Sequence, residues 1–250
     1  MRTVDVNTVI ENARLGRFHW TLLFWVTLII TCDGYDMMVY GVVLPRLMEH
    51  WQLSPMAAGA LGSAALVGMM VGAMSFGTIA DRLGRKSVTI VCVVLFSVAT
   101  VVAGLSATPW QFGILRFVAG LGIGGVMPNV VALLTEYAPK RSRSTLVAIM
   151  FSGYAFGGMI AAGLGIWIVP AFGWPMMFYV AVVPLLVLPL LIRDLPESAS
   201  FLLRRNGEEA VRGILRAIDP DRVLAADDRL ALPPVAAGRA PVVALFAEGR

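Results

Sequence analysis

The sequence predicts an all-α integral membrane protein, built as a bundle of six transmembrane helices. Hydrophobic residues make up 58% of its 250 residues and charged residues 14%, against about 45–50% and about 25% in soluble proteins. The apolar residues also gather in six runs, each near or above the roughly 20 residues that a membrane-spanning helix needs. This composition excludes a disordered chain. It also argues against a nucleic-acid partner, because the basic residues lie in short clusters between apolar runs.

The six expected spans are separated by short polar or charged stretches. They cover residues 20–44, 55–80, 87–106, 110–136, 145–169 and 174–192. We expect residues 1–19 to form an N-terminal segment and residues 193–250 a polar tail. Within the tail, four apolar residues recur at helical spacing and predict an amphipathic helix, on the membrane or on the bundle: Val211, Ile214, Leu215 and Ile218. Residues 232–240 are interpreted as a linker.

Basic residues mark one side of the expected bundle. They occupy the N-terminal segment and the loops after the second and fourth spans, whereas the opposite side carries only Arg46. Because Lys and Arg concentrate in cytoplasmic loops, both termini are predicted to be cytoplasmic. The residues that set this orientation are Arg2, Arg14, Arg17, Arg82, Arg85, Lys86, Lys140, Arg141 and Arg143.

Glycines inside the spans predict close helix packing rather than a cofactor site. Gly68 and Gly72 form a GxxxG pair, and such small residues let helices approach closely in lipid. Residues 120–125 read GLGIGG, but a dinucleotide-binding loop needs a preceding strand, and these glycines lie inside an apolar run. The two cysteines, Cys32 and Cys92, cannot supply a zinc site. No cofactor and no metal are therefore expected.

Three charged residues within the spans are candidate functional residues. Asp33 and Asp36 lie one helical turn apart in the first span and share a face, and Arg116 lies in the fourth span. Each acid costs roughly 2.5–3.5 kcal/mol to insert near a helix centre, and such residues usually mark ion or substrate pathways. The alternative is that the acids are permanently neutral or ion-paired and serve packing.

Depth along the helices suggests how these charges could meet. At about 1.5 Å per residue, Asp36 lies roughly 12 Å from the outer end of its span and Arg116 roughly 9 Å from the outer end of its own. Arg116 could therefore pair with Asp36, bind a substrate carboxylate, or extend to the membrane interface. Three further polar residues are candidates for lining a cavity: Tyr35, Asn129 and Tyr154.

The loop after the second span resembles a known signature. Residues 77–86 read GTIADRLGRK, similar to the motif between the second and third helices of the major facilitator superfamily. Residues 116–124 resemble its fourth-helix motif, residues 136–143 the loop that follows, and residues 196–202 the end of its sixth helix. The resemblance implies the N-terminal half of that fold, with two inverted three-helix repeats. It also implies a cytoplasmic gate made of Gly77, Asp81, Arg82, Gly84, Arg85, Lys86, Glu136 and Arg143.

A motif in the first span resembles one particular family within this superfamily. Residues 33–36 read DGYD after the lead-in LGRF at 15–18, which resembles the aromatic acid–proton symporter family. The resemblance implies a transporter rather than an enzyme, in a bacterial-type inner membrane. It would take up benzoate-, hydroxybenzoate- or phenylpropionate-type acids with protons, by alternating access. Asp33 and Asp36 would carry or gate the proton, and Arg116 would bind the substrate carboxylate or pair with Asp36.

Length is where the chain departs from the superfamily, which has twelve helices in two halves. We therefore expect an N-terminal half, whose partner is a missing C-terminal half or a second copy, with residues 241–250 approaching a seventh helix. One alternative is a transporter of the same superfamily for a sugar, a dicarboxylate or another metabolite. Another is a membrane sensor or partner subunit that does not transport, in which Asp36→Asn would leave activity intact.

Overall fold

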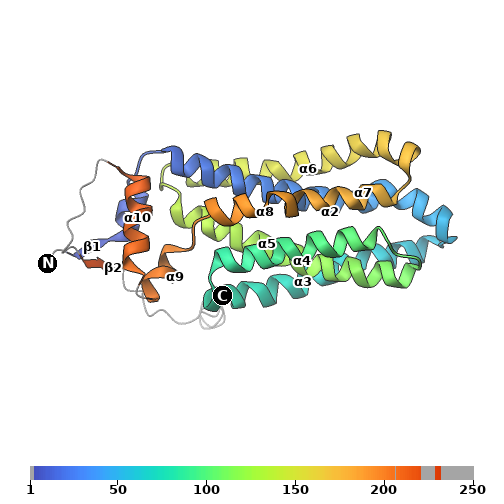
Figure 1. The fold of residues 1–250 in the computed structure, drawn as a ribbon, viewed down its shortest axis with the longest axis horizontal. Helices are drawn as coiled ribbons and strands as arrows, with labels where there is room; N and C mark the ends of the chain where they lie inside the picture. The colour runs from blue at the N-terminus through green and yellow to red at the C-terminus, as the bar shows by residue number, and fades with distance from the viewer. Residues whose placement is uncertain (1–2, 206, 221–228, 232–250) are drawn as a thin grey trace, which may run out of the picture.

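The computed structural model describes residues 3–205, 207–220 and 229–231. Within them, six segments are long and apolar enough to cross a membrane, which confirms the expected number of spans. They run side by side as an elongated bundle (Figure 1). The spans are α2 (Arg17–Trp51), α3 (Pro55–Leu83), α4 (Arg85–Ala103), α5 (Pro109–Tyr137), α6 (Arg143–Phe172) and a sixth made of α7 (Pro175–Tyr179), η1 (Val180–Val182) and α8 (Val183–Asp194).

Local sequence explains where several of these helices begin and end. Ser54 and Thr108 cap the first turns of α3 and α5, and each is followed by proline at the first helical position, where the missing N–H costs nothing. Gly84 and Gly173 end α3 and α6 with φ angles of +93° and +82°. The first span is longer than expected, because α2 continues through Pro45 to Trp51.

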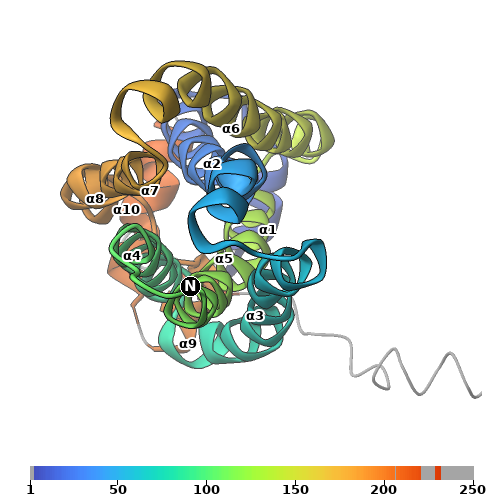
Figure 2. The ribbon, with the colours of Figure 1, turned by 90° about the vertical axis from the view of Figure 1, so that its right-hand side faces the viewer.

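Two helix pairs pack with their backbones almost in contact. A Cβ at Gly72 of α3 would meet the carbonyl oxygen of Leu121 in α5, and one at Gly157 of α6 would meet that of Thr31 in α2. The view along the bundle shows α2 beside α6 and α3 beside α5 (Figure 2). The pair of α2 and α6 joins spans one and five, and the pair of α3 and α5 joins spans two and four. If spans one to three are matched in order with spans four to six, each pair becomes the other, as two three-helix repeats require.

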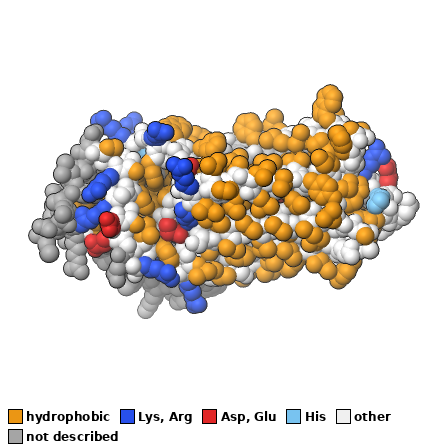
Figure 3. Space-filling view, viewed as in Figure 1, with side chains coloured by type: hydrophobic (Ala, Val, Ile, Leu, Met, Phe, Trp, Pro, Cys, Tyr) orange, Lys and Arg blue, Asp and Glu red, His pale blue; other side chains and the backbone are white. Residues whose placement is uncertain are grey.

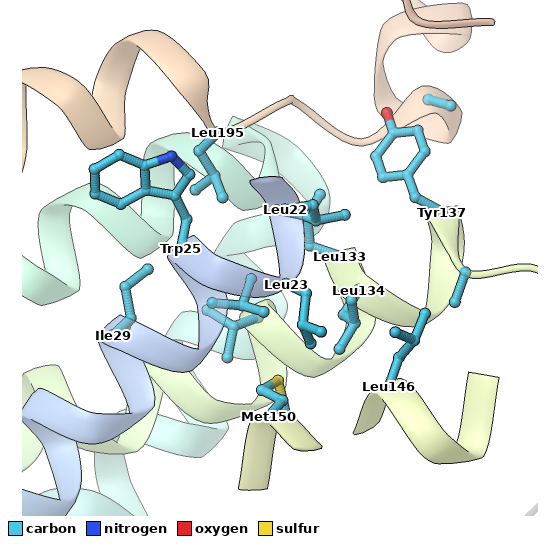
Figure 4. Packing of buried hydrophobic residues seen from close by; sticks show 14 of the residues in the cluster. Leu22, Leu23, Trp25, Ile29, Leu133, Leu134, Tyr137, Leu146, Met150 and Leu195 are labelled. Carbon is cyan, nitrogen blue, oxygen red and sulfur yellow. The ribbon is translucent and has the colours of Figure 1, made fainter. Parts of the chain in front are cut away.

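Most of the side chains in the interior of the bundle are apolar. Leu22 and Ile29 of α2 pack with Leu133 of α5 and Met150 of α6, as the close view shows (Figure 4). Hydrophobic side chains also cover most of the bundle surface seen in Figure 3. Trp167 of α6 is one of the large apolar side chains that are exposed. Soluble monomers rarely expose a continuous apolar surface of this kind, so the exterior fits a lipid environment.

One end of the bundle, named here the basic end, gathers most of the Lys and Arg side chains seen on this face (Figure 3). A small cap covers it, made of β1 (Thr3–Asp5), α1 (Val6–Glu11), α9 (Ala199–Arg204), α10 (Glu208–Ile218) and β2 (Arg229–Ala231). Strands β1 and β2 pair in parallel, although they come from opposite ends of the chain. The sequence did not predict this pairing.

Helix α10 lies in the part of the tail where an amphipathic helix is expected. Its apolar residues Val211, Leu215 and Ile218 are buried, and the helix packs against α1, α2 and α9. Of the two expected placements, the structure therefore shows the one on the bundle. The expected linker at 232–240 and the segment 241–250 lie outside the described residues.

Candidate functional site

Asp36 and Arg116 form an ion pair inside the bundle. Arg116 Nη1 donates to Asp36 Oδ2 at 2.8 Å, and Nη2 donates to the backbone carbonyl of Asp36 at 3.1 Å. Both side chains are 1% exposed. The structure therefore shows the pairing, which was one of the three arrangements that their depths left open. The expectation that Arg116 extends to the membrane interface is wrong, because both Nη groups of the buried guanidinium bond to Asp36.

A third residue completes this arrangement. Thr100 of α4 donates its hydroxyl to Asp36 Oδ1 at 2.5 Å, and its side chain is fully buried. Asp36 therefore joins α2, α4 and α5 at one point. Sequence reasoning missed Thr100 because a hydroxyl in an apolar run has many uses. The available signal was the pair Ser97 and Thr100, one turn apart in the otherwise apolar second half of the helix.

Asp33 has a different environment. It is 0% exposed, and neither carboxylate oxygen has a hydrogen-bond partner among the described residues. Buried polar groups normally have partners, and each exception needs an explanation. Because leaving such a group unpaired is costly, Asp33 remains a candidate for transient contact with an ion or a substrate.

The three residues expected to line a cavity have distinct contacts. The hydroxyl of Tyr35 donates to the carbonyl of Met177 at 2.7 Å, and Tyr35 lies with Asp36 along an apolar cavity of about 220 Å³. Asn129 donates to the carbonyl of Gly125 in its own helix at 2.7 Å. Tyr154 is half-buried on α6, with its backbone carbonyl beside Gly34.

A wider groove of about 690 Å³ lies between α3, α5 and α6. Its walls are mainly apolar, with Met69 and Met70 from α3, Met127 from α5 and Phe151 from α6. The groove reaches Thr135 near the basic end. It is therefore an open apolar face of the bundle, rather than an enclosed pocket.

At the basic end, the expected gate residues divide into two groups. Gly84 makes the tight turn between α3 and α4, and a Cβ there would collide with the carboxylate of Glu197. Glu197 Oε1 accepts from the backbone N–H of Lys86 at 3.0 Å. The start of α4 is therefore hydrogen-bonded to Glu197, in the segment that follows α8. Asp81 and Arg82 form the second group, whose side chains are exposed.

Glu136 and Arg143 lie on one cavity of about 460 Å³, together with Arg85 and Glu11. Glu136 Oε1 accepts from the hydroxyls of Ser198 and Ser200, at 3.0 and 2.6 Å. Arg143 donates to Glu11 at 3.4 Å. The motif residues therefore contact both the N-terminal segment and the chain after the sixth span, two connections that the sequence did not predict.

Comparison with known proteins identifies the family of this chain. A family model for the Major Facilitator Superfamily matches residues 17–246. The chain belongs to the Major Facilitator Superfamily. Among solved structures, the xylose transporter XylE from E. coli in a partially occluded inward-open conformation superposes with a TM-score of 0.73 at 25% identity, covering 80% of this chain and 55% of that one. The six-helix bundle is therefore half of the superfamily fold.

Several curated relatives carry the names of aromatic acids. The benzoate transport protein of Acinetobacter baylyi is 52% identical over 88% of this chain and 48% of its own length. The gallate transporter of Pseudomonas putida is 36% identical over 98% and 55%. The 4-hydroxybenzoate transporter PcaK of the same species is 38% identical over 89% and 50%. The chain spans about half the length of these relatives.

Superfamily membership confirms two expectations. The chain is a multi-pass inner-membrane protein, and its relatives are membrane transporters rather than enzymes. Similarity to benzoate, gallate and hydroxybenzoate transporters also agrees with the resemblance carried by the DGYD motif at 33–36.

Proposed function

We propose that this chain is the N-terminal half of a proton-coupled importer of an aromatic carboxylate. The observation that carries the proposal is the buried pair of Asp36 and Arg116, held inside a bundle whose relatives are named for benzoate, gallate and 4-hydroxybenzoate. Intramembrane charges of this kind usually mark ion or substrate pathways. No covalent chemistry is needed for this function.

The geometry suggests how a proton and an acid would be coupled. A proton that binds Asp36 Oδ2 breaks the hydrogen bond from Arg116 Nη1. Arg116 then keeps only the bond from Nη2 to the backbone carbonyl of Asp36, and the freed donors of its planar guanidinium can bind another carboxylate. A substrate anion therefore replaces Asp36 as the partner of Arg116. In this scheme Asp33, which has no partner among the described residues, passes or gates the proton.

Transport also needs a second half-bundle. In this superfamily fold, substrate sites lie between two halves that rock against each other. The apolar groove of α3, α5 and α6 supplies a face for the C-terminal half or for a second copy. With both termini cytoplasmic, as the basic residues indicate, the basic end is the cytoplasmic side. Gly77, Asp81, Arg82, Gly84, Arg85, Lys86, Glu136 and Arg143 would then form the gate.

The test is uptake of radiolabelled benzoate by cells that express the complete gene product. We expect uptake that an uncoupler abolishes and that excess 4-hydroxybenzoate blocks, whereas excess xylose or succinate leaves it unchanged. Inhibition by xylose or succinate alone would favour the alternative substrate classes. Absence of any uptake, with the protein present in the membrane, would favour the sensor or partner subunit.

The sugar alternative rests on one observation, the structural similarity to a xylose transporter. That similarity concerns the fold, which hosts many substrates. The aromatic acid relatives match at higher sequence identity, 36–52% against 25%. The aromatic carboxylate is therefore the better supported substrate class.

A further inference from the structure

Thr100 departs from the usual behaviour of a threonine in a helix. Helical threonines commonly donate their hydroxyl to the carbonyl four residues earlier. Thr31, Thr89 and Thr135 all do so here, at 2.7–2.8 Å. Thr100 instead directs its hydroxyl across to another helix, onto Asp36 Oδ1 at 2.5 Å. The contact therefore connects α4 to the charged pair.

The contact also assigns a separate role to each oxygen of Asp36. Oδ1 accepts from Thr100, and Oδ2 accepts from Arg116. Arg116 holds Asp36 a second time, through its backbone carbonyl. With Oδ1 occupied by an uncharged donor, the oxygen whose protonation breaks the ion pair is Oδ2.

We propose that Thr100 is a positioning residue of the coupling site: it holds Oδ1 of Asp36 so that the proton binds Oδ2, the oxygen paired with Arg116. The proton forms an O–H bond at Oδ2 and the hydrogen bond from Arg116 Nη1 breaks, while Thr100 continues to donate to Oδ1. This inference rests on the proposed function and adds a residue from α4, a helix that supplies no charge to the site.

Two variants and a matched control test this role. Thr100→Val keeps the shape of the side chain but removes the hydroxyl, and Thr100→Ser restores a donor. Ser97→Ala removes another buried hydroxyl of α4, one turn earlier, which has no hydrogen-bond partner among the described residues. All three are made in the complete gene product, and their amounts in the membrane are matched by immunoblot.

The readout compares two modes of benzoate movement. Proton-driven uptake requires Asp36 to gain and lose its proton, whereas exchange from preloaded vesicles, with the proton gradient collapsed, does not. A hydrogen bond to a charged group is worth about a tenfold change or more in an equilibrium. We expect Thr100→Val to lower proton-driven uptake about tenfold and to leave exchange nearly unchanged. Thr100→Ser should recover most of the uptake, and Ser97→Ala should resemble the wild type.

Three results would overturn the role of Thr100. They are normal uptake by Thr100→Val, an equal loss of uptake and exchange in that variant, and failure of Thr100→Ser to recover uptake.

If the wild type moves no benzoate in either mode, the proposed function fails instead. The role of Thr100 is then decided by thermal unfolding of Thr100→Val, Asp36→Asn and the double variant. Additive shifts would overturn it, and non-additive shifts would retain the contact for another substrate.

Discussion

At the scale of single residues, Asp36 connects three helices, because its carboxylate accepts from Thr100 of α4 and from Arg116 of α5. The meeting of Asp36 and Arg116 could be predicted, because charges stand out in apolar spans and the helical rise gives their depth. Thr100 could not be predicted, because only the structure shows whether a hydroxyl bonds to its own helix or to a neighbour. The lack of a partner for Asp33 was equally invisible, since burial depends on how the helices pack.

Separate substitutions should distinguish the structural and transport roles of the ion pair. Asp36→Asn and Arg116→Ala each leave half of a buried pair, which typically costs about 3–5 kcal/mol. Both should lower the unfolding temperature in detergent and abolish uncoupler-sensitive uptake. The double variant Asp36→Leu/Arg116→Met should recover most of the stability but none of the uptake. Uptake by the double variant would remove both residues from the site.

Asp33 should respond in the opposite way to Asp36. Asp33→Asn replaces a buried carboxyl group that has neither a hydrogen-bond partner nor an ion-pair partner among the described residues. We therefore expect an unfolding temperature no lower than that of the wild type, together with loss of uncoupler-sensitive uptake. A fall in stability as large as that of Asp36→Asn would show that Asp33 has a structural partner instead.

The helices were the most predictable elements, because long apolar runs leave few other structures in lipid. Two features escaped prediction for local reasons. The sixth span changes to a 3-10 turn at Val180–Val182, and one apolar run does not reveal where a helix is interrupted. Strands β1 and β2 have three residues each, too few for any periodicity to indicate them.

Close contact between α2 and α6 can be tested at Gly34. A Cβ there would meet the backbone carbonyl of Tyr154, whereas one at Gly41 of the same helix would meet nothing within 4 Å. Gly34→Ala should lower the free energy of unfolding by about 1–3 kcal/mol. Gly41→Ala should leave it unchanged or slightly raised, because alanine favours a helix. Equal effects of the two changes, measured by thermal unfolding, would contradict this packing.

At the scale of the whole molecule, the basic end connects segments that are distant in sequence. Asp81 is exposed there, where a second half-bundle could contact it. Asp81→Asn should therefore slow benzoate uptake without changing which acids compete, as measured by initial rates with a panel of competitors. A changed competition profile would instead place this loop in substrate selection.

The proposed second half can be examined through the size of the native polypeptide. An antibody to residues 206–230 would be used on membranes of the source organism. A band near twice the 26.8 kDa of this chain would agree with a conventional two-half transporter. A band near 26.8 kDa would mean either that two copies assemble for transport, which cross-linking of the same membranes would detect, or that the chain is a sensor that does not transport.

The pairing of β1 with β2 has a consequence for biosynthesis. Thr3–Asp5 is synthesised before any of the six spans, whereas its partner Arg229–Ala231 is synthesised after all of them. The N-terminal strand must therefore wait, unpaired, throughout membrane insertion, and the cap closes only once the sixth span is in place. Closure of the cap would thus report that the six spans have all been inserted.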